Sequence, residues 1–330
     1  MMKASFPKRS VIHEASLRFI SVIGLFAILL FFSFSSEVFF TGNNLSVIAT
    51  NCSLLLIVTS AMTLVIRSGG IDLSVGTAFD LGALVAISII HNGGNTQNAI
   101  ILGILSGVVI GLFNGFLIVY LKISPFLATL GTLYIGVSVQ RILTHGGDPI
   151  YLKPSDTPSL FVSFGRGQFL GLSIPAWISL LLFALVFVIL ERLTFGREVT
   201  AFGMQPMAAF VGGISVKANL FRIYVLSSVI CATAGVLLGA RLTAYVPLSG
   251  DYYLLDAIGA VFIGTTLSNT GRPSPMGSLI GALIFTVLAN GMNLLGISFY
   301  FQGLTRGLII IVILGLSVRR NRSMSKLLVK

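Results

Sequence analysis

Long apolar stretches follow one another along most of this chain, and they constrain its fold more than any other feature. A helix that crosses the apolar layer of a membrane needs about 20 consecutive apolar residues. Charged residues are only 9% of the 330 residues, and hydrophobic residues are 55%. A soluble domain cannot build a water-exposed surface from so few charges. We therefore predict an all-α fold, a polytopic helical bundle in a membrane.

The pattern predicts about ten transmembrane spans, some of them short or broken. Those in the first half lie at Leu17–Phe34, Leu45–Ile66, Leu73–Ile90, Ala99–Tyr120 and Pro125–Val139. Those in the second half lie at Ile174–Leu190, Ile223–Ala240, Leu254–Leu267, Met276–Leu295 and Leu304–Val318. No small-residue cleavage site follows the first span, so we expect a retained helix rather than a signal peptide.

Most of the 21 Lys and Arg residues lie after alternate spans, as expected if cytoplasmic flanks are basic. This distribution favours an even number of spans with both termini in the cytoplasm. We expect a cytoplasmic tail over residues 1–16, a transmembrane domain over 17–318 and a basic cytoplasmic tail over 319–330. The loop at about 141–173 is then extracytoplasmic, with a short partly buried segment, and the loop at about 191–222 is cytoplasmic.

The segment Ser68–Gly76, SGGIDLSVG, interrupts the apolar pattern with one carboxylate, two hydroxyls and three glycines. Irregular backbone survives at membrane depth only where protein or a water-filled cavity satisfies its polar groups. Asp72 or Ser74 is expected to cap the next helix, and a capped break is also how many transporters line a path. Asp80, on the same span, needs a partner if it is buried. Asp72, Ser74 and Asp80 are therefore our first candidates for a solute path.

Polar side chains in other spans extend the candidate path. Asn290 and Asn293 share a helix face at i, i+3 spacing, as do Gln302 and Arg306 at i, i+4. Singly, each of these side chains is expected to form hydrogen bonds between helices. Together they suit a lining for a hydroxyl-rich solute. The remaining path candidates are Asn114, Asp256, Asn290 and Asn293.

Glycine recurs at every fourth position of one span, at Gly103, Gly107, Gly111 and Gly115. Such residues line one helix face and allow another backbone to approach closely. We expect tight helix packing there, within the subunit or across a dimer.

Motifs for catalysis and metal binding are missing from the sequence. It contains no GxxxxGK[ST] phosphate loop and no HExxH, and its three histidines are scattered. The two cysteines lie in apolar runs, which argues against a disulfide or a metal site. Because the basic residues are dispersed, a nucleic-acid partner is not expected. We expect no catalytic residue, metal or cofactor in this chain.

The segment Gly196–Lys217 is too short and too interrupted to cross a membrane. Its break at Gly203–Pro206, followed by MAAFVGG, predicts a short helix bounded by small residues. One interpretation is a connector that lies on the inner leaflet. The other is a docking helix whose small Ala208 and Ala209 fit a groove on a cytoplasmic partner.

Five motifs occur in an order that resembles the membrane (permease) subunit of ribose-type carbohydrate ABC importers. They are SGGIDLSVG (68–76), PFLATLGTLYIG (125–136), GREVTAFGMQPMAAFVGGISV (196–216), LDAIGAVFIGTTLS (255–268) and ANGMNLLG (289–296). The resemblance implies a subunit of a bacterial inner membrane that works as a homo- or heterodimer. It also implies an external solute-binding protein and a cytoplasmic ATPase that uses ATP and Mg, besides the surrounding lipid. ATPase coupling is carried over to Gln205, Pro206, Ala208, Ala209, Gly212 and Gly213.

The chain departs from that family pattern after the eighth span. Gly264, Gly271 and Ser274 match the usual glycine-rich loop, whereas Thr265, Thr270 and Pro273 stand where glycine is usual. Thr adopts positive φ at a cost and Pro cannot adopt it. We therefore expect an altered loop backbone, and we hypothesise a specialised subunit that pairs with a more typical one.

Two other functions stay open at this stage. An ion- or proton-coupled secondary transporter would use buried ionisable residues such as Asp72, Asp80, Asp256 and Arg306. An ABC permease for branched-chain amino acids or nucleosides shares the wider superfamily. The sequence favours a permease that passes a monosaccharide or sugar-like solute and draws its energy from a separate ATPase.

Overall fold

A computed structural model describes residues 20–268, 271–298, 300–312 and 315. The predicted tails at 1–16 and 319–330, and Thr270, lie outside the described residues. The first helices are α2 (Ile20–Ser35), α3 (Gly42–Arg67), α4 (Val75–His91), α5 (Thr96–Val119) and α6 (Pro125–Leu143). The later ones are α8 (Ile174–Glu191), α9 (Thr194–Met204), α10 (Pro206–Val211), α11 (Val216–Leu242), α12 (Gly250–Leu267), α13 (Pro275–Leu294) and the helix Tyr300–Val312.

Among the described residues, six helices are long and apolar enough to cross a membrane: α3, α5, α6, α8, α11 and α13. The helices α2, α4 and Tyr300–Val312 are apolar but shorter. Each of these helices, and α12, overlaps one of the predicted spans. The all-α polytopic membrane fold is confirmed.

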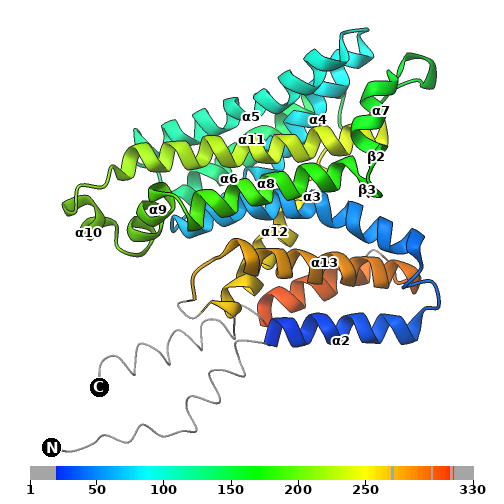
Figure 1. The fold of residues 1–330 in the computed structure, drawn as a ribbon. Helices are drawn as coiled ribbons and strands as arrows, with labels where there is room; N and C mark the ends of the chain where they lie inside the picture. Colours follow the sequence, from blue (N-terminus) through cyan, green and yellow to red (C-terminus); the bar gives the residue numbers. More distant parts are fainter. Residues whose placement is uncertain (1–19, 269–270, 299, 313–314, 316–330) are drawn as a thin grey trace, which may run out of the picture.

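The helices run roughly alongside one another, with α3 and α11 in the interior (Figure 1). The outer helices α5, α6 and α8 have only 28% of the residues of their apolar spans buried inside the protein, as expected for surfaces that face lipid. In Figure 1, α2, α13 and the helix Tyr300–Val312 lie together on one side of the bundle. The helices α9 and α10 lie at one end of the bundle, which we call the α10 end, and α7 lies at the other.

The predicted glycine stripe packs against α11 of the same chain. A Cβ atom on Gly107 would overlap the Ser228 carbonyl, and one on Gly111 would overlap the backbone of Val225. Helix α4 touches α11 in the same way, because a Cβ atom on Gly235 would overlap the Phe79 carbonyl. Small residues therefore join α4, α5 and α11 backbone to backbone, so the predicted close packing is confirmed within the subunit.

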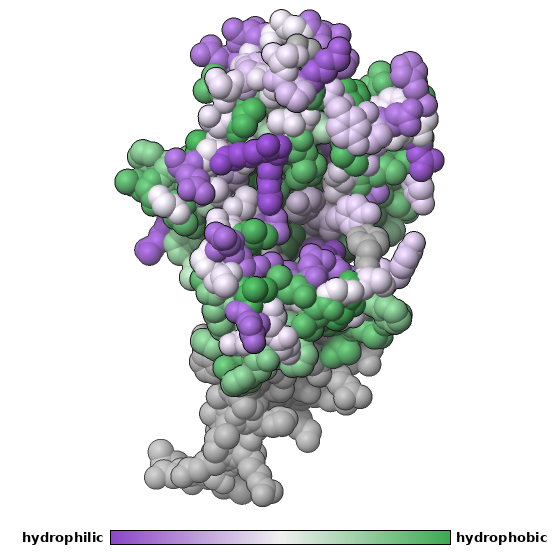
Figure 2. Space-filling view, turned by 90° about the vertical axis from the view of Figure 1, so that its right-hand side faces the viewer, coloured by the Kyte–Doolittle hydropathy of each residue, from purple (hydrophilic) through white to green (hydrophobic). Residues whose placement is uncertain are grey.

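The loop predicted to be extracytoplasmic does contain a short, partly buried segment. It is α7 (Ser159–Arg166), with Phe161 fully buried. A 3-10 turn, η1 (Pro154–Asp156), precedes it, and the strands β2 (Gln168–Phe169) and β3 (Leu172–Ser173) follow as a hairpin. The strand β1 (Ile150–Tyr151) pairs with β4 (Ala244–Tyr245) after α11. Figure 2 views this end of the molecule, where hydrophilic side chains are prominent in the upper part and hydrophobic patches lie among and below them.

The structure differs from the expected spans between residues 191 and 223. Residues 194–204 form a helix, α9, whereas the sequence predicted only one short helix in this loop, after the break at Gly203–Pro206. Helix α11 begins at Val216, seven residues before the predicted Ile223. Its first turn is held by protein rather than lipid, because Asn219 donates from Nδ2 to Glu198 Oε2 of α9 at 2.7 Å. Hydropathy alone does not detect such a polar first turn.

Candidate functional site

The predicted break between α3 and α4 is a tight turn at residues 68–69, an irregular stretch at residues 70–72 and a second turn at residues 73–74. Helix α3 ends at Arg67, and the Gly70 N–H returns to the Val65 carbonyl at 3.2 Å. Gly69 adopts a φ of +86°, a conformation that side chains with a Cβ rarely take. The glycines therefore reverse the end of α3 so that residues 71–74 run through the protein interior.

Asp72 organises the turn that leads into α4. Its Oδ1 accepts from the Ser74 N–H at 2.8 Å and from the Ser74 hydroxyl at 2.6 Å. Both residues are fully buried. Ser74 occupies the N-cap position of α4, but its hydroxyl bonds Asp72 instead of the helix. Asp72 Oδ2 has no hydrogen-bond partner among the described residues.

Asn114 ties this turn to two further helices. It donates from Nδ2 to the Ser74 hydroxyl at 2.6 Å and accepts from the Thr132 hydroxyl of α6 at 2.6 Å. One turn earlier on α6, the Thr129 hydroxyl accepts from the Leu73 N–H at 3.1 Å. The structure thus brings together the predicted Asp72, Ser74 and Asn114. It adds Thr129 and Thr132, which the sequence interpretation missed because a threonine in an apolar helix carries no distinctive signal.

Asp80 lies in a second cluster, at the start of α12. Its Oδ1 accepts from the Gly250 N–H at 2.9 Å, which supplies the partner that the sequence could not identify. The backbones meet there, since a Cβ atom on Gly250 would overlap Gly76. A carboxylate at this position satisfies a free N–H and faces the positive end of the α12 dipole.

The remaining path candidates form contacts near α12 and α13. Asp256 pairs with Arg306 of the helix Tyr300–Val312 at 3.1 Å. Asn290 exchanges two hydrogen bonds with Asn44 of α3, at 2.8 and 3.0 Å. Asn293 accepts from Gln302 at 2.8 Å. The seven candidates therefore fall into separate interhelical contacts rather than one continuous row, and their role in a solute path stays a prediction.

The loop predicted to couple to an ATPase contains the expected short helix, α10. Gln205 has a non-helical backbone (φ −144°, ψ 85°) between α9 and α10, and it is exposed, as are Pro206, Ala208, Gly212 and Gly213. The prediction that Ala209 fits a groove on a partner is wrong, because Ala209 is only 7% exposed and packs into the main hydrophobic core. It faces inward because α10 must bury one side against α9 and α11. The side that a partner can reach carries exposed apolar residues instead: Met204, Met207, Phe210 and Val211.

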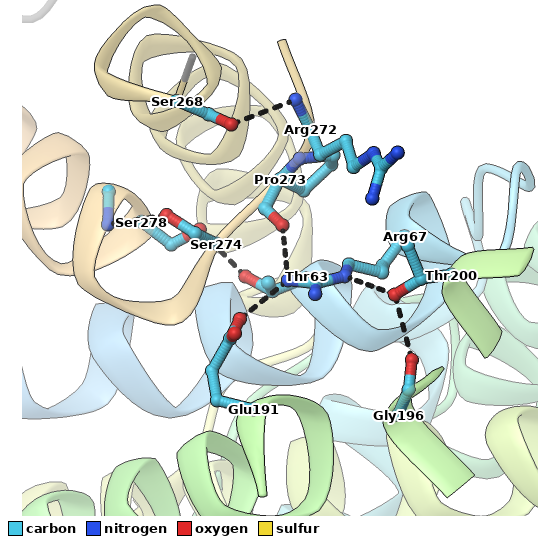
Figure 3. Close-up of polar contacts among 11 residues, drawn as sticks. Thr63, Arg67, Glu191, Gly196, Thr200, Ser268, Arg272, Pro273, Ser274 and Ser278 are labelled. Carbon is cyan, nitrogen blue, oxygen red and sulfur yellow. Dashed lines mark hydrogen bonds and ion pairs between the residues drawn. The ribbon is translucent and has the colours of Figure 1, made fainter. Parts of the chain in front are cut away.

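Arg67 joins several elements at the α10 end, and we call these contacts the junction. The sequence interpretation used this residue only as a marker of topology. Its guanidinium pairs with Glu191 of α8 at 2.6 Å and donates to the Thr200 hydroxyl of α9 at 2.8 Å. It also donates to the Pro273 carbonyl, before α13, at 2.9 Å (Figure 3). These contacts join residues far apart in the sequence, so no local pattern predicts them.

The altered glycine-rich loop lies beside this junction. Thr265 falls inside α12 and needs no positive φ, whereas Gly271 keeps a φ of +65°. Ser274 caps α13, accepting from the Gly277 N–H at 3.2 Å. Gly264 and Gly277 touch backbone to backbone. The Pro273 carbonyl accepts a hydrogen bond from Arg67, so this loop contributes an acceptor to the junction.

A groove of about 560 Å³ lies on the outside of the bundle, between α5, the region of α8 and α9, and α11. It is lined by Leu112, Ile189, Leu193, Phe195, Phe221, Arg222, Val225 and Leu226. The predicted path residues are not among them. Its apolar lining fits lipid chains better than a polar solute.

Comparisons with known proteins place the chain in a family. The family model for the permease component of branched-chain amino acid transport systems matches residues 44–314. The ribose import permease protein RbsC of Bacillus subtilis is 36% identical over 290 residues, 88% of this chain and 89% of the relative. RbsC of Escherichia coli K12 is 35% identical over 292 residues, 88% and 91% of the two chains.

A galactose/methyl galactoside import permease, MglC of Escherichia coli K12, is 33% identical over 305 residues, 87% of this chain and 90% of the relative. No solved structure matches significantly. The resemblance to ribose-type permeases is thus confirmed over nearly the whole length of the chain. The chain belongs to the family of permease components typified by branched-chain amino acid transport systems.

Proposed function

We propose that this chain is the membrane-spanning permease subunit of an ABC importer for a monosaccharide or a sugar-like solute. The observation that carries the proposal is about one-third identity, across nearly the full length of both chains, to permeases named for ribose and galactose import. The helical membrane fold agrees with that role. An importer for branched-chain amino acids or nucleosides is less favoured, because the permeases that match at 33–36% identity over nearly the whole chain are named for ribose and galactose import.

Two of the buried charges, Asp80 and Asp256, also argue against a secondary transporter. Coupling to ions or protons requires ionisable groups that gain and lose a partner along the pathway. Here Asp80 is held by the α12 N-terminus and Asp256 by Arg306, each in its own interhelical contact. These pairings suit structural positions in a bundle better than a relay.

The importer requires partners that supply energy and solute. We assign ATP and Mg to a separate cytoplasmic ATPase, since this chain lacks a phosphate loop. The exposed apolar side of α10, with Met207 and Phe210, fits a groove on that ATPase. A solute-binding protein would deliver the sugar at the end that carries α7. A second permease subunit completes the dimer, in a bacterial inner membrane with both termini inside.

Transport would proceed by alternating access. ATP binding moves the ATPase against α10, and the displacement passes along α9 into the helix bundle. The hydrogen bond between Asn114 and Thr132 joins α5 to α6, so it can part and re-form as the bundle tilts. Weak contacts along the path allow release, and selectivity then depends mainly on the binding protein.

The direct test is reconstitution. We would purify the tagged chain together with the ATPase that it binds, insert the complex into vesicles and supply ATP inside. Uptake of labelled ribose, galactose and related sugars is measured with loaded binding protein outside. The expected result is ATP-dependent accumulation of one sugar class. Accumulation by this chain alone, without an ATPase and driven by an ion gradient, would refute the proposal.

A further inference from the structure

Arg67 occupies an unusual position for a charged side chain. It is the last residue of α3 and immediately precedes the Ser68–Gly76 break, and its side chain is only 11% exposed. Removing a charge from water is costly unless paired and hydrogen-bonded groups surround it. The contacts of Arg67 therefore define where its guanidinium can lie.

Each partner of Arg67 belongs to a different element. The Nη1 atom donates hydrogen bonds to Glu191 at the end of α8 and to the Pro273 carbonyl in the loop before α13. The Nε atom donates to the Thr200 hydroxyl of α9. The Thr200 hydroxyl also donates to the Gly196 carbonyl at 2.7 Å, so its lone pair is directed at Arg67 (Figure 3). One guanidinium thus contacts the end of α8, the middle of α9 and the loop before α13, and holds all three against α3.

The backbone makes a second connection at the same place. A Cβ atom on Gly203, near the end of α9, would overlap the Arg67 carbonyl, and one on Gly69 would lie 3.1 Å from the Gly203 carbonyl. The end of α9 therefore rests directly on the first residues of the break. Helix α9 cannot shift without moving either Arg67 or Gly69.

The far side of the junction is tied to α3 as well. One turn before Arg67, the Thr63 hydroxyl donates to the Ser278 hydroxyl of α13 at 2.8 Å. Together with the Pro273 contact, this bond holds the first turn of α13 against α3. A displacement of α9 then has a route to α13 through two neighbouring residues of α3.

We infer that Arg67 is a positioning residue that transmits movement of the α9–α10 segment to the Ser68–Gly76 break and to the start of α13. The inference rests on the proposed function, since it names the link between the ATPase contact and the membrane path. Arginine suits the task because its planar group offers Nε–H and Nη–H donors in fixed directions, whereas lysine presents one mobile ammonium. Loss of the link leaves ATP hydrolysis running while transport fails.

The test uses the intact complex of permease, ATPase and binding protein in vesicles. Arg67→Gln removes the ion pair, and Thr200→Val removes one acceptor from α9 while keeping its shape. Lys122→Gln is the matched control, because Lys122 is an exposed basic residue between α5 and α6, outside the junction. Subunit ratio, ATP hydrolysis and sugar uptake are measured for each variant.

We expect both junction variants to assemble and hydrolyse ATP, with sugar transported per ATP reduced by about tenfold in Arg67→Gln and less in Thr200→Val. Arg67→Lys should recover part of the ratio, because it retains a partner for Glu191. A wild-type ratio in assembled Arg67→Gln would overturn the inference. Loss of assembly in Arg67→Gln, together with a wild-type ratio in Thr200→Val, would also overturn it and leave Arg67 a purely structural role.

The wild-type complex separates this inference from the proposed function. If it shows no ATP-driven sugar uptake, the proposed function fails, and the inference fails with it. If it transports sugar and the junction variants match it, only the inference fails.

Discussion

Asp80 of α4 accepts a hydrogen bond from the backbone N–H of Gly250, the first residue of α12, at 2.9 Å. The contact joins two helices whose residues are 170 positions apart in the sequence. The buried Asp80 carboxylate therefore has a structural role, because it satisfies a backbone N–H at the start of α12. The same reasoning yields predictions for other contacts in the molecule.

Asp80→Ala should destabilise the subunit by about 1–3 kcal/mol, since it leaves the buried Gly250 N–H unpaired. Asp80→Asn keeps an oxygen acceptor and loses only the attraction of a charge to the α12 N-terminus, about 0.3–1 kcal/mol. Thermal unfolding of the purified complex in detergent measures both variants. Equal midpoints for the two would contradict this assignment.

Gly107→Ala and Gly111→Ala should each destabilise the fold by about 1–3 kcal/mol, because the added methyl group meets the backbone of α11. Gly131→Ala in α6 is the matched control, since a Cβ there meets nothing within 4 Å. That substitution should be neutral or stabilising by up to about 1 kcal/mol, through helix propensity. Thermal unfolding again separates them, and three similar midpoints would count against close packing of α5 on α11.

Met207→Asp or Phe210→Asp should reduce binding of the ATPase by about 30-fold without changing the fold of the permease. Both side chains are exposed, at 76% and 68%, and both lie on α10. Leu170→Asp, 78% exposed in the β2–β3 turn, is the control at the opposite end. Co-purification of the tagged ATPase measures the effect, and normal recovery with both α10 variants would place the docking surface elsewhere.

Asp72→Ala should preserve assembly but reduce sugar uptake by about tenfold, since the buried Ser74 donors lose their acceptor. Asp72→Asn retains an acceptor for that turn. If Asp72 lines the solute path, Asp72→Asn should reduce uptake as well, because the Oδ2 atom that it replaces makes no hydrogen bond in the turn. Vesicle uptake distinguishes these cases. Normal uptake in Asp72→Ala would remove Asp72 from the path.

The apolar pattern predicted the helices well, because span length and low charge follow directly from the solvent. It failed where protein replaces lipid. The amphipathic α9 and the polar first turn of α11 are stabilised by each other, through Asn219 and Glu198. Sequence reasoning located the break at Ser68–Gly76 from its glycines and Asp72. It could not find the partners of Asp80 or Arg67, since those contacts depend on tertiary packing.

The backbone contacts of Gly107, Gly111 and Gly235 have a mechanical consequence. Three helices that touch main chain to main chain have no compressible side-chain layer between them, so they cannot slide independently. The helices α4, α5 and α11 must therefore move as one rigid body, and any hinge has to lie at the edge of that body. We expect the hinge along α3, where the side chains of Thr63 and Asn44 form hydrogen bonds with α13.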